Sequence, residues 1–496
     1  MDSAGLTERL DSLTSWHSDW TGLRVGVLGL GKTGFSVADT LVELGARVLV
    51  VAQRADDSQV QLVGVIGAEL VLDAVLDAPP TALVELEPEL LVVSPGFHPD
   101  HPVLLWAAAA GIPVWGDVEL AWRLRDKVGT PAEWLAVTGT NGKTTTVQLT
   151  ATMLVAGGLR AAPCGNIGIP ILDAIRDPQG FDVLVVELSS YQLHSTFSMS
   201  PFSAVCLNLA EDHLDWHGSF EAYAAAKARV YTKTKVACVY NRSDERTQSM
   251  VEEAEVVEGA RAIGFGLGVP GLSDLGVVDG ILCDRAFTDD RRTTALEITT
   301  VTALAERGLG APHTVANILA ACALARSFGV GIPAIRAALA SFELDHHRIE
   351  PVATAAGVTW VNDSKATNAH AANASLGAFE NIVWIAGGLL KGVDVEPLVK
   401  ARAGKLRAVV LIGVDREALR KAFERHAPEV PLFEVTAVET DQVMPTAVRL
   451  AAAQAAPGDV VLLAPAAASM DQFVDYQGRG DSFARAVREY LGGGGS

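Results

Sequence analysis

Short apolar runs that break into glycine-rich or polar turns recur along the whole chain. The first run, residues 23–28, leads into Gly29-Leu30-Gly31-Lys32-Thr33-Gly34. A helical pattern over 35–44 and a second apolar run over 47–51 follow. This order of strand, tight turn, helix and strand is typical of a Rossmann-like unit. Further short strands are predicted at 90–93 and 111–114.

A second block begins near residue 130. Its first apolar run, 134–137, leads into Gly139-Thr140-Asn141-Gly142-Lys143-Thr144-Thr145, and a helix is predicted over 146–156. Residues 250–300 alternate short apolar runs with Gly, Asp and Thr, which favours hairpins over strand–helix units. Other strands are predicted at 181–186, 204–209 and 235–240, and a helix at 313–328.

A third block begins near residue 345. Four apolar runs, at 358–361, 382–386, 408–412 and 460–463, each lead into a loop of small or polar residues. Ligands of open α/β sheets bind outside the carboxyl ends of the strands, so these loops are expected to form one rim. The pattern as a whole predicts an α/β protein with three domains. They are a Rossmann-like N-terminal domain (1–122), a central P-loop mononucleotide-binding domain (123–344) and a Rossmann-like C-terminal domain (345–496).

Composition and net charge limit the kinds of molecule that the protein is expected to bind. The 496 residues are 49% hydrophobic, and 59 acidic against 39 basic residues give a formal charge of -20. This charge argues against a nucleic-acid or anionic-membrane surface, so anionic ligands must be held by local groups. The five scattered cysteines contain no C-x-x-C pair, which argues against a disulfide framework or a thiolate zinc site.

The sequence predicts neither a signal peptide nor a membrane-spanning helix. The N-terminal residues lack the apolar core of a signal peptide, and no predominantly apolar run of 18 residues occurs, so a reduced cytoplasmic protein is expected. The glycine-serine run at 492–496 is either a native tail or an added sequence, and it does not enter the fold prediction.

The strongest chemical signal is the run from Gly139 to Thr145. Successive backbone N–H groups in a glycine-rich strand-to-helix turn cradle phosphates, Lys143 can reach the β- and γ-phosphates, and the Thr144 hydroxyl suits Mg²⁺. A glycine-rich turn with a surface lysine is the plainer alternative, but the flanking strand and helix favour nucleotide binding. Glu187 ends an apolar strand further along the chain, where an acid can lie near P-loop magnesium.

Three other signals are weak when taken alone. His213 follows an apolar strand, where a structural hydrogen-bonding histidine is the commoner case. Lys227 lies in an alanine-rich helical stretch and would ordinarily be a solvated lysine. The Gly29–Gly34 spacing fits a dinucleotide motif, but the next strand ends in Gln53 and Arg54 with no carboxylate for a ribose. That motif therefore indicates only a ligand that contains a diphosphate.

Five strings together resemble the Mur ligase family, in the family's order and over nearly the whole chain. They lie at 139–145, 164–168 (CGNIG), 187–193 (ELSSYQL), 211–215 (EDHLD) and 362–368 (NDSKATN), and the last resembles the members that add D-glutamate. The resemblance implies an ATP-dependent amide ligase of peptidoglycan precursor synthesis. ATP would phosphorylate the terminal carboxylate of UDP-N-acetylmuramoyl-L-alanine, and the amine of D-glutamate would attack the acyl phosphate. A cytoplasmic monomer with small-molecule substrates is implied.

The resemblance also implies roles for individual residues. Catalytic roles fall to Lys143, Glu187, His213 and Lys227, the last carbamylated by CO₂. Two Mg²⁺ ions would be held by Thr144, Glu187, His213 and Lys227. ATP would contact Gly139, Thr140, Asn141, Gly142, Lys143, Thr144, Thr145, Asn317, Arg348 and Asp363. The UDP-substrate would contact Lys32, Thr33, Gln53, Arg54, Ser94, Asn166 and Ser189. D-Glutamate would contact Lys365, Thr367, Ser469 and Tyr476.

Departures from the family pattern and rival functions remain. Tyr476 stands where some relatives carry Phe, Trp216-His217 replaces an Arg-Tyr pair, and Leu389-Leu390 precedes Lys391, which receives no role. One rival is another Mur-type or folylpolyglutamate-type ligase with a different acceptor. An NAD-dependent oxidoreductase built on Gly29–Gly34 would leave Lys143 and Glu187 without a role. A non-catalytic nucleotide-binding regulator would leave the candidate metal ligands unexplained.

Overall fold

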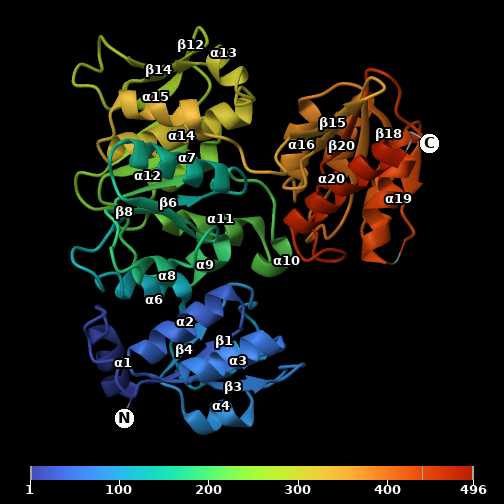
Figure 1. Cartoon of the computed structure of the whole chain (residues 1–496). Helices are drawn as coiled ribbons and strands as arrows, with labels where there is room; N and C mark the ends of the chain where they lie inside the picture. The colour runs from blue at the N-terminus through green and yellow to red at the C-terminus, as the bar shows by residue number, and fades with distance from the viewer. Residues whose placement is uncertain (1–2, 438, 494–496) are drawn as a thin grey trace. The chain divides into compact units, whose positions relative to one another are not determined.

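A computed structural model describes residues 3–437 and 439–493, and its strands form three separate sheets (Figure 1). Every sheet is built mainly from parallel strands with helices between them, which confirms the α/β prediction and its three domains. Of the glycine-serine run at the C-terminus, residues 494–496 lie outside the described part. Within the described residues, no helix is both long enough and apolar enough to span a membrane.

The N-terminal sheet is parallel throughout, in the order β3-β2-β1-β4-β5. Its central strands are buried on both faces, which explains their near-continuous apolar sequences. The strands are β1 (Arg24–Leu28), β2 (Arg47–Ala52), β3 (Glu69–Leu72), β4 (Leu90–Val93) and β5 (Val114–Gly116). The helices are α1 (Ser3–Ser12), α2 (Lys32–Glu43), α3 (Asp57–Ile66), α4 (Thr81–Leu86), α5 (Pro102–Ala109) and α6 (Asp117–Arg123).

The central sheet has the order β14-β13-β12-β11-β10-β9-β6-β8-β7. The strands are β6 (Glu133–Thr138), β7 (Ala161–Gly165), β8 (Val183–Glu187), β9 (Ser203–Cys206), β10 (Ala237–Asn241), β11 (Arg261–Phe265), β12 (Asp274–Val278), β13 (Ile281–Asp284) and β14 (Leu296–Thr300). The helices are α7 (Lys143–Ala156), α8 (Ile171–Ile175), α9 (Ser190–His194), α10 (Leu214–His217), α11 (Phe220–Ala228), α12 (Glu245–Glu252), α13 (Val301–Ala305), α14 (Pro312–Ser327) and α15 (Ile332–Ser341), with a 3₁₀ turn at Arg229–Tyr231.

The expectation of hairpins over 250–300 is correct for one part and wrong for another. Strands β12, β13 and β14 pair antiparallel, with a register shift between Leu282 and Cys283. Strand β11, however, pairs parallel with β10, and α12 connects the two, so this is a strand–helix–strand unit. Helix α12 begins at Glu245, five residues before the stretch 250–300, and most of its residues are polar, so it leaves little apolar pattern there.

The C-terminal sheet has the order β15-β16-β20-β17-β18-β19, with β15 antiparallel at one edge. The four predicted strands are neighbours and parallel, so their carboxyl ends share one edge as expected. The strands are β15 (Glu350–Ala355), β16 (Val358–Asn362), β17 (Ile382–Ala386), β18 (Leu406–Leu411), β19 (Leu432–Glu434) and β20 (Val460–Leu463). The helices are α16 (Ala369–Gly377), α17 (Glu396–Arg402), α18 (Glu417–His426), α19 (Thr440–Ala452) and α20 (Tyr476–Gly493), with a 3₁₀ turn at Ala403–Lys405.

The chain divides into two compact units that do not follow the order of the sequence. Unit 1 comprises residues 1–209 and 224–342, and unit 2 comprises residues 210–223 and 343–496. The first two sheets therefore belong to the same unit. Buried polar contacts join them, because Gln192 of the central domain donates to Asp117 (2.9 Å), and Glu119 accepts the backbone N–H of Phe197 (2.8 Å).

Candidate active site

The P-loop predicted from the sequence lies between β6 and α7 in unit 1. Gly139 and Gly142 adopt φ values of 143° and 84°, a region that favours glycine. Gly142 caps α7 without a side-chain hydrogen bond, so the helix N-terminus presents backbone N–H groups to the loop. The Lys143 ammonium folds over the loop and donates to the carbonyls of Gly139 and Thr140, both at 2.9 Å.

Two asparagines brace this loop. Asn208, after β9, accepts the N–H of Asn141 (2.9 Å) and donates to its carbonyl (3.0 Å). Asn317 of α14 lies so close to Gly142 that an added Cβ would meet its Oδ1 at 2.4 Å. The structure thus brings Asn317 beside the loop, and its contact with ATP stays a prediction. Asn208 received no predicted role, because the strand was expected to run through it to residue 209; in the structure β9 (Ser203–Cys206) ends two residues earlier and Asn208 lies in the loop.

Glu187 ends β8, beside the strand that leads into the P-loop. Glu187 pairs with Val137 of β6 in the sheet register, and 3% of its surface is exposed. One carboxylate oxygen, Oε1, accepts the amide of Asn166 at 3.0 Å. The other, Oε2, is buried and has no hydrogen-bond partner among the described residues. A buried carboxylate oxygen with spare capacity is the type of ligand that Mg²⁺ takes.

Lys227 is not a solvated helix lysine. Helix α11 directs it inward, leaving 2% of its surface exposed, and its ammonium donates to Gly139 O (2.9 Å) and Thr138 Oγ1 (3.3 Å). The Thr138 hydroxyl in turn donates to the carbonyl of Leu188 (2.8 Å). Thr138 therefore links Lys227 to the residue that follows Glu187.

These groups fit a magnesium site that relies on few protein ligands. Thr144 at the start of α7 is buried, and Glu187 offers the free oxygen described above. In the described part of the chain, no group of three or more His, Cys, Asp or Glu side chains could hold a metal ion. Mg²⁺ usually combines one or two carboxylates with substrate phosphates and water, so the sparse protein donor set is compatible with it.

His213 lies in unit 2, on the segment 210–223. It has a φ of 56° and caps the short helix α10. Asp212 accepts from Asn368 (3.2 Å) and from the ammonium of Lys391 (3.3 Å), which also lies 3.5 Å from His213 Nε2. Lys391, which the sequence analysis left without a role, is thus part of a polar cluster with the predicted metal ligand His213.

The residues expected to bind the UDP-substrate lie on several loops of unit 1. Ser94 Oγ lies against Gly29, is buried, and has no hydrogen-bond partner among the described residues. Lys32 and Thr33 begin α2, and the exposed pair Gln53 and Arg54 follows the neighbouring strand β2. A Cβ at Gly34 would meet the carbonyl oxygen of Gly29 at 2.0 Å, so the third glycine of the motif permits close packing.

Ser189, the remaining residue of that set, lies on the central domain. It caps α9 in a capping box with Gln192, whose amide oxygen accepts the N–H of Ser189 at 3.1 Å. The amide nitrogen of the same Gln192 donates to Asp117. Gln192 and Asp117 were not predicted as site residues; the structure places them in a chain of hydrogen bonds that ends at Ser189.

The residues expected to bind D-glutamate meet in unit 2. The Lys365 ammonium lies 3.8 Å from the centroid of the Tyr476 ring, a cation–π contact. Lys365 and Thr367 follow β16, Ser469 follows β20, and β16 and β20 are adjacent parallel strands. Ser469 is buried, while Lys365 and Thr367 are half-buried. The tyrosine that departs from some relatives therefore still provides the aromatic face.

Asp363, predicted to contact ATP, is buried beside this cluster. Its carboxylate accepts the hydroxyl of Ser375 and the N–H of Ile349 (3.3 Å). Burial raises the pKa of Asp363 to about 6, an effect that the Ser375 hydrogen bond and the nearby Arg348 charge oppose. Arg348 is half-buried in the same unit.

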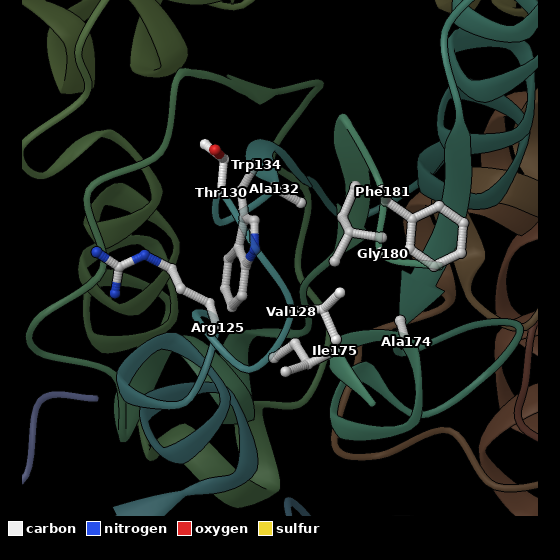
Figure 2. A pocket seen from close by; sticks show the side chains of 10 residues that line it. Arg125, Val128, Thr130, Ala132, Trp134, Ala174, Ile175, Gly180 and Phe181 are labelled. Atoms are coloured by element: carbon white, nitrogen blue, oxygen red, sulfur yellow. The ribbon is translucent and has the colours of Figure 1, made fainter. Parts of the chain in front are cut away.

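A cavity also occurs at the opposite end of the central sheet, near the amino ends of β6 and β8 (Figure 2). Its lining is mainly apolar, and the buried indole N–H of Trp134 has no hydrogen-bond partner among the described residues. None of the predicted site residues lines it. The cavity is therefore separate from the P-loop edge.

Comparison with protein families agrees with this geometry. The Mur ligase middle domain matches residues 137–325, the glutamate ligase domain of Mur ligases matches 347–467, and the MurD-like N-terminal domain matches 23–116. A protein from Leifsonia xyli named UDP-N-acetylmuramoylalanine--D-glutamate ligase is 68% identical, over 98% of this chain and 96% of its own length. A protein of the same name from Mycolicibacterium smegmatis is 45% identical, over 95% of this chain and 97% of its own.

Solved structures share the fold at low sequence identity. A pseudomurein peptide ligase type C from Methanothermus fervidus superposes with a TM-score of 0.58 at 17% identity, over 94% of this chain and 100% of its own. The MurF ligase from Thermotoga maritima, solved in complex with ADP, gives 0.55 at 18% identity, over 97% of this chain and 99% of its own. From the domain matches and the close relatives together, the chain belongs to the Mur ligase family.

Proposed function

We propose that this chain is an ATP-dependent ligase that joins D-glutamate to UDP-N-acetylmuramoyl-L-alanine during peptidoglycan precursor synthesis. The observation that carries the proposal is the set of groups at the P-loop edge of the central sheet. There Lys143 and the buried Lys227 both donate to the carbonyl of Gly139 in the glycine-rich loop, and Glu187 on the strand beside it has a carboxylate oxygen with no hydrogen-bond partner among the described residues. The D-glutamate assignment is supported by the names of the close relatives and by the Lys365–Tyr476 pair.

The reaction has two bond exchanges. A carboxylate oxygen of the UDP-substrate attacks the γ-phosphorus of ATP, the new O–P bond forms, and the bond to ADP breaks. The amine of D-glutamate then attacks the acyl carbon, the C–O bond to phosphate breaks, and the amine loses a proton. In this scheme Lys143 neutralises the charge on the transferring phosphoryl group, and backbone N–H groups of the P-loop orient it.

Magnesium would be held by Thr144, Glu187, His213 and a carbamate on Lys227, and it would offset the charge of the phosphates. Carbamate formation joins the neutral lysine amine to CO₂ by a new N–C bond and releases one proton. The burial of Lys227 favours such a change, because a buried cation close to bound Mg²⁺ would be repelled. The carbamate instead contributes a negative charge.

Substrate positions follow from the loops. The UDP part would lie at the carboxyl edge of the N-terminal sheet, where the spare hydroxyl of Ser94 can donate to a phosphate or uridine oxygen. Lys32 and Arg54 supply positive charge there. D-Glutamate would place a carboxylate at Lys365, with Thr367 and Ser469 as hydrogen-bond donors.

The proposal includes a cytoplasmic monomer with domains at 1–122, 123–344 and 345–496. All five cysteines lie in the described part of the chain, and all are buried and free of disulfides. Free thiols are expected of a protein kept in a reducing compartment.

The decisive experiment measures phosphate release with ATP, Mg²⁺ and UDP-N-acetylmuramoyl-L-alanine, together with D-glutamate or one of a panel of amino acids. Release that requires D-glutamate is expected. Release with L-lysine, meso-diaminopimelate or L-glutamate instead would keep the ligase and replace its acceptor. No release with any acceptor, from protein supplied with bicarbonate, would contradict the proposed reaction.

A further inference from the structure

Arg479 is an arginine of α20 that no predicted role explains. Only 1% of its surface is exposed, so its guanidinium is fully inside unit 2. Among the described residues, no Asp or Glu side chain forms a salt bridge with it; burial lowers its pKa to about 9, an effect that the charge of Asp471 only partly opposes. A buried charge without a salt bridge is costly unless its N–H groups are hydrogen-bonded, so the hydrogen bonds that Arg479 makes must matter to the fold or to the site.

Those hydrogen bonds go to two loops. Nη2 donates to the carbonyl of Ser364 (2.9 Å), and Nε donates to the Ser364 hydroxyl (3.0 Å). Nη1 donates to the carbonyl of Ala467 at 3.0 Å. Ser364 lies in the loop after β16 and Ala467 in the loop after β20, so one planar group joins the carboxyl ends of two adjacent strands.

A third segment is attached through Ser364. Its hydroxyl accepts from Arg479 and donates to the carbonyl of Tyr476 at 2.8 Å. Tyr476 is the first residue of α20, the helix that carries Arg479. The guanidinium thereby fixes the start of its own helix against the loop after β16.

Each attachment point belongs to the expected D-glutamate site or lies within two residues of one of its members. Ser364 precedes Lys365, Ala467 is two residues before Ser469, and Tyr476 provides the ring that Lys365 contacts. We propose that Arg479 is a positioning residue that holds these three segments in the geometry required to bind the acceptor amino acid. The proposal rests on the proposed function for the identity of that acceptor.

The geometry of the guanidinium is the reason that arginine is required. Its N–H groups form a rigid planar fork, which can reach the Ser364 carbonyl, the Ser364 hydroxyl and the Ala467 carbonyl at once. A lysine ammonium at the same position is a point donor on a flexible chain. Arg479→Lys keeps the charge but loses the planar fork.

The test compares Arg479→Lys and Arg479→Ala with Arg485→Ala, an exposed arginine of the same helix. For Arg479→Lys, we expect the KM for D-glutamate to rise by tenfold or more, while the KM for ATP changes less than twofold. Guanidinium ion added to Arg479→Ala should lower the KM for D-glutamate again, and Arg485→Ala should behave as wild type. An unchanged KM for D-glutamate in Arg479→Lys, or an equal rise in both KM values, would overturn the proposal.

A second readout keeps the proposal testable without activity. Hydrogen–deuterium exchange of residues 364–369 and 467–476 should be faster in Arg479→Lys and in Ser364→Ala than in wild type, and should be unchanged in Arg485→Ala. Unchanged exchange in these segments would count against the inference. If wild type uses another amino acid, the proposed acceptor fails, but the KM comparison for that amino acid still tests Arg479.

Discussion

Lys227 shows at the scale of one residue how an ordinary sequence context can hide a chemical group. Its neighbours in the sequence are alanines and an arginine, which is typical of a solvated helix face. Its burial arises because α11 packs the side chain against Thr138 and Gly139, almost ninety residues earlier in the chain. Only the family resemblance pointed to this lysine before the structure was known.

The proposed carbamate gives a prediction for this residue. Lys227→Ala should abolish ligation, because the negative charge near Mg²⁺ is lost, and short-chain carboxylic acids such as acetate should restore part of the activity. Phosphate release with and without added acid measures both effects. Lys235→Ala removes a partly buried lysine that is paired with Glu133, outside the predicted site, and should retain activity with no response to acid. Full activity of Lys227→Ala would contradict the assigned role.

Asp117 gives a prediction about pH. Full burial raises its pKa to about 6, above the ordinary 3.8, although the hydrogen bond from Gln192 opposes the shift. The folded state therefore binds this proton more tightly, and the contribution of Asp117 to stability falls as pH rises from about 4 to 6. Asn keeps the shape but cannot ionise. As pH rises from 5 to 7.5, the difference in unfolding free energy between Asp117→Asn and wild type should therefore change by about 1 kcal/mol in favour of the variant.

Denaturant unfolding at both pH values measures this difference. The pKa of Asp363 is raised in the same way, so two carboxyl groups make the stability of wild type fall as pH rises. The variant should keep only the contribution of Asp363. An equal change of stability with pH in Asp117→Asn and wild type would show that Asp117 does not carry the effect.

Secondary-structure elements were predictable where their burial was two-sided. Strands β1, β6, β17 and β20 are continuous apolar runs because helices cover both faces of parallel sheets. The edge strands β3, β15 and β19 were not predicted, since they are only partly buried and mix polar with apolar residues. Local pattern cannot identify such strands, because their pairing depends on distant partners.

Site residues, too, were predictable from the sequence only where their signal is local. The glycine-rich loop at 139–145 could be predicted because its residues are contiguous and lie between an apolar strand and a helix. Arg479 lies in a Gly-Arg-Gly string that carries no signal, and its three hydrogen bonds all reach residues brought near by the fold. Contacts between strand ends became visible only with the sheet order.

The P-loop also yields a prediction at the scale of the element. Gly142→Ala would place a Cβ against Asn317 and strain a φ of 84°, so the KM for ATP should rise. Gly158, near the end of α7, has a φ of 86° with nothing within 4 Å of an added Cβ. The positive φ should cost each variant about 1 kcal/mol of stability. The contact with Asn317 should add to that cost in Gly142→Ala, and only this variant should bind ATP more weakly. Nucleotide titration measures the effect on ATP binding, and thermal unfolding measures the effect on stability. Unchanged ATP affinity in Gly142→Ala would contradict the prediction.

For the whole molecule, the most informative feature is the path of the chain between the two units. Residues 210–223 belong to unit 2, although unit 1 supplies the chain on both sides of them. Helix α11 spans the return point, because its first residues belong to unit 2 and Ala224 to Ala228 belong to unit 1. The return is therefore made by a helix rather than by a loop.

This helix gives a prediction about coupling. Ala225→Gly weakens α11 at an exposed position, and Ala337→Gly does the same in α15, which lies wholly in unit 1. Each should cost about 1 kcal/mol of helix stability. If α11 transmits force between the units, Ala225→Gly should lower kcat by up to about fivefold, and Ala337→Gly should not. The steady-state kcat values of the two variants are compared at equal folded fraction. Equal kcat values would show that α11 does not couple the two units.

The path of the chain also limits how the protein can be dissected. A fragment that begins at residue 343 would have every strand of the C-terminal sheet, yet Asn368 and Lys391 would lose Asp212, which belongs to a distant stretch of sequence. Cutting the gene at the apparent border would therefore yield an incomplete half. Joining residues 210–223 to that fragment through a short linker would restore the missing piece, and only in that form would the half represent its counterpart in the intact enzyme.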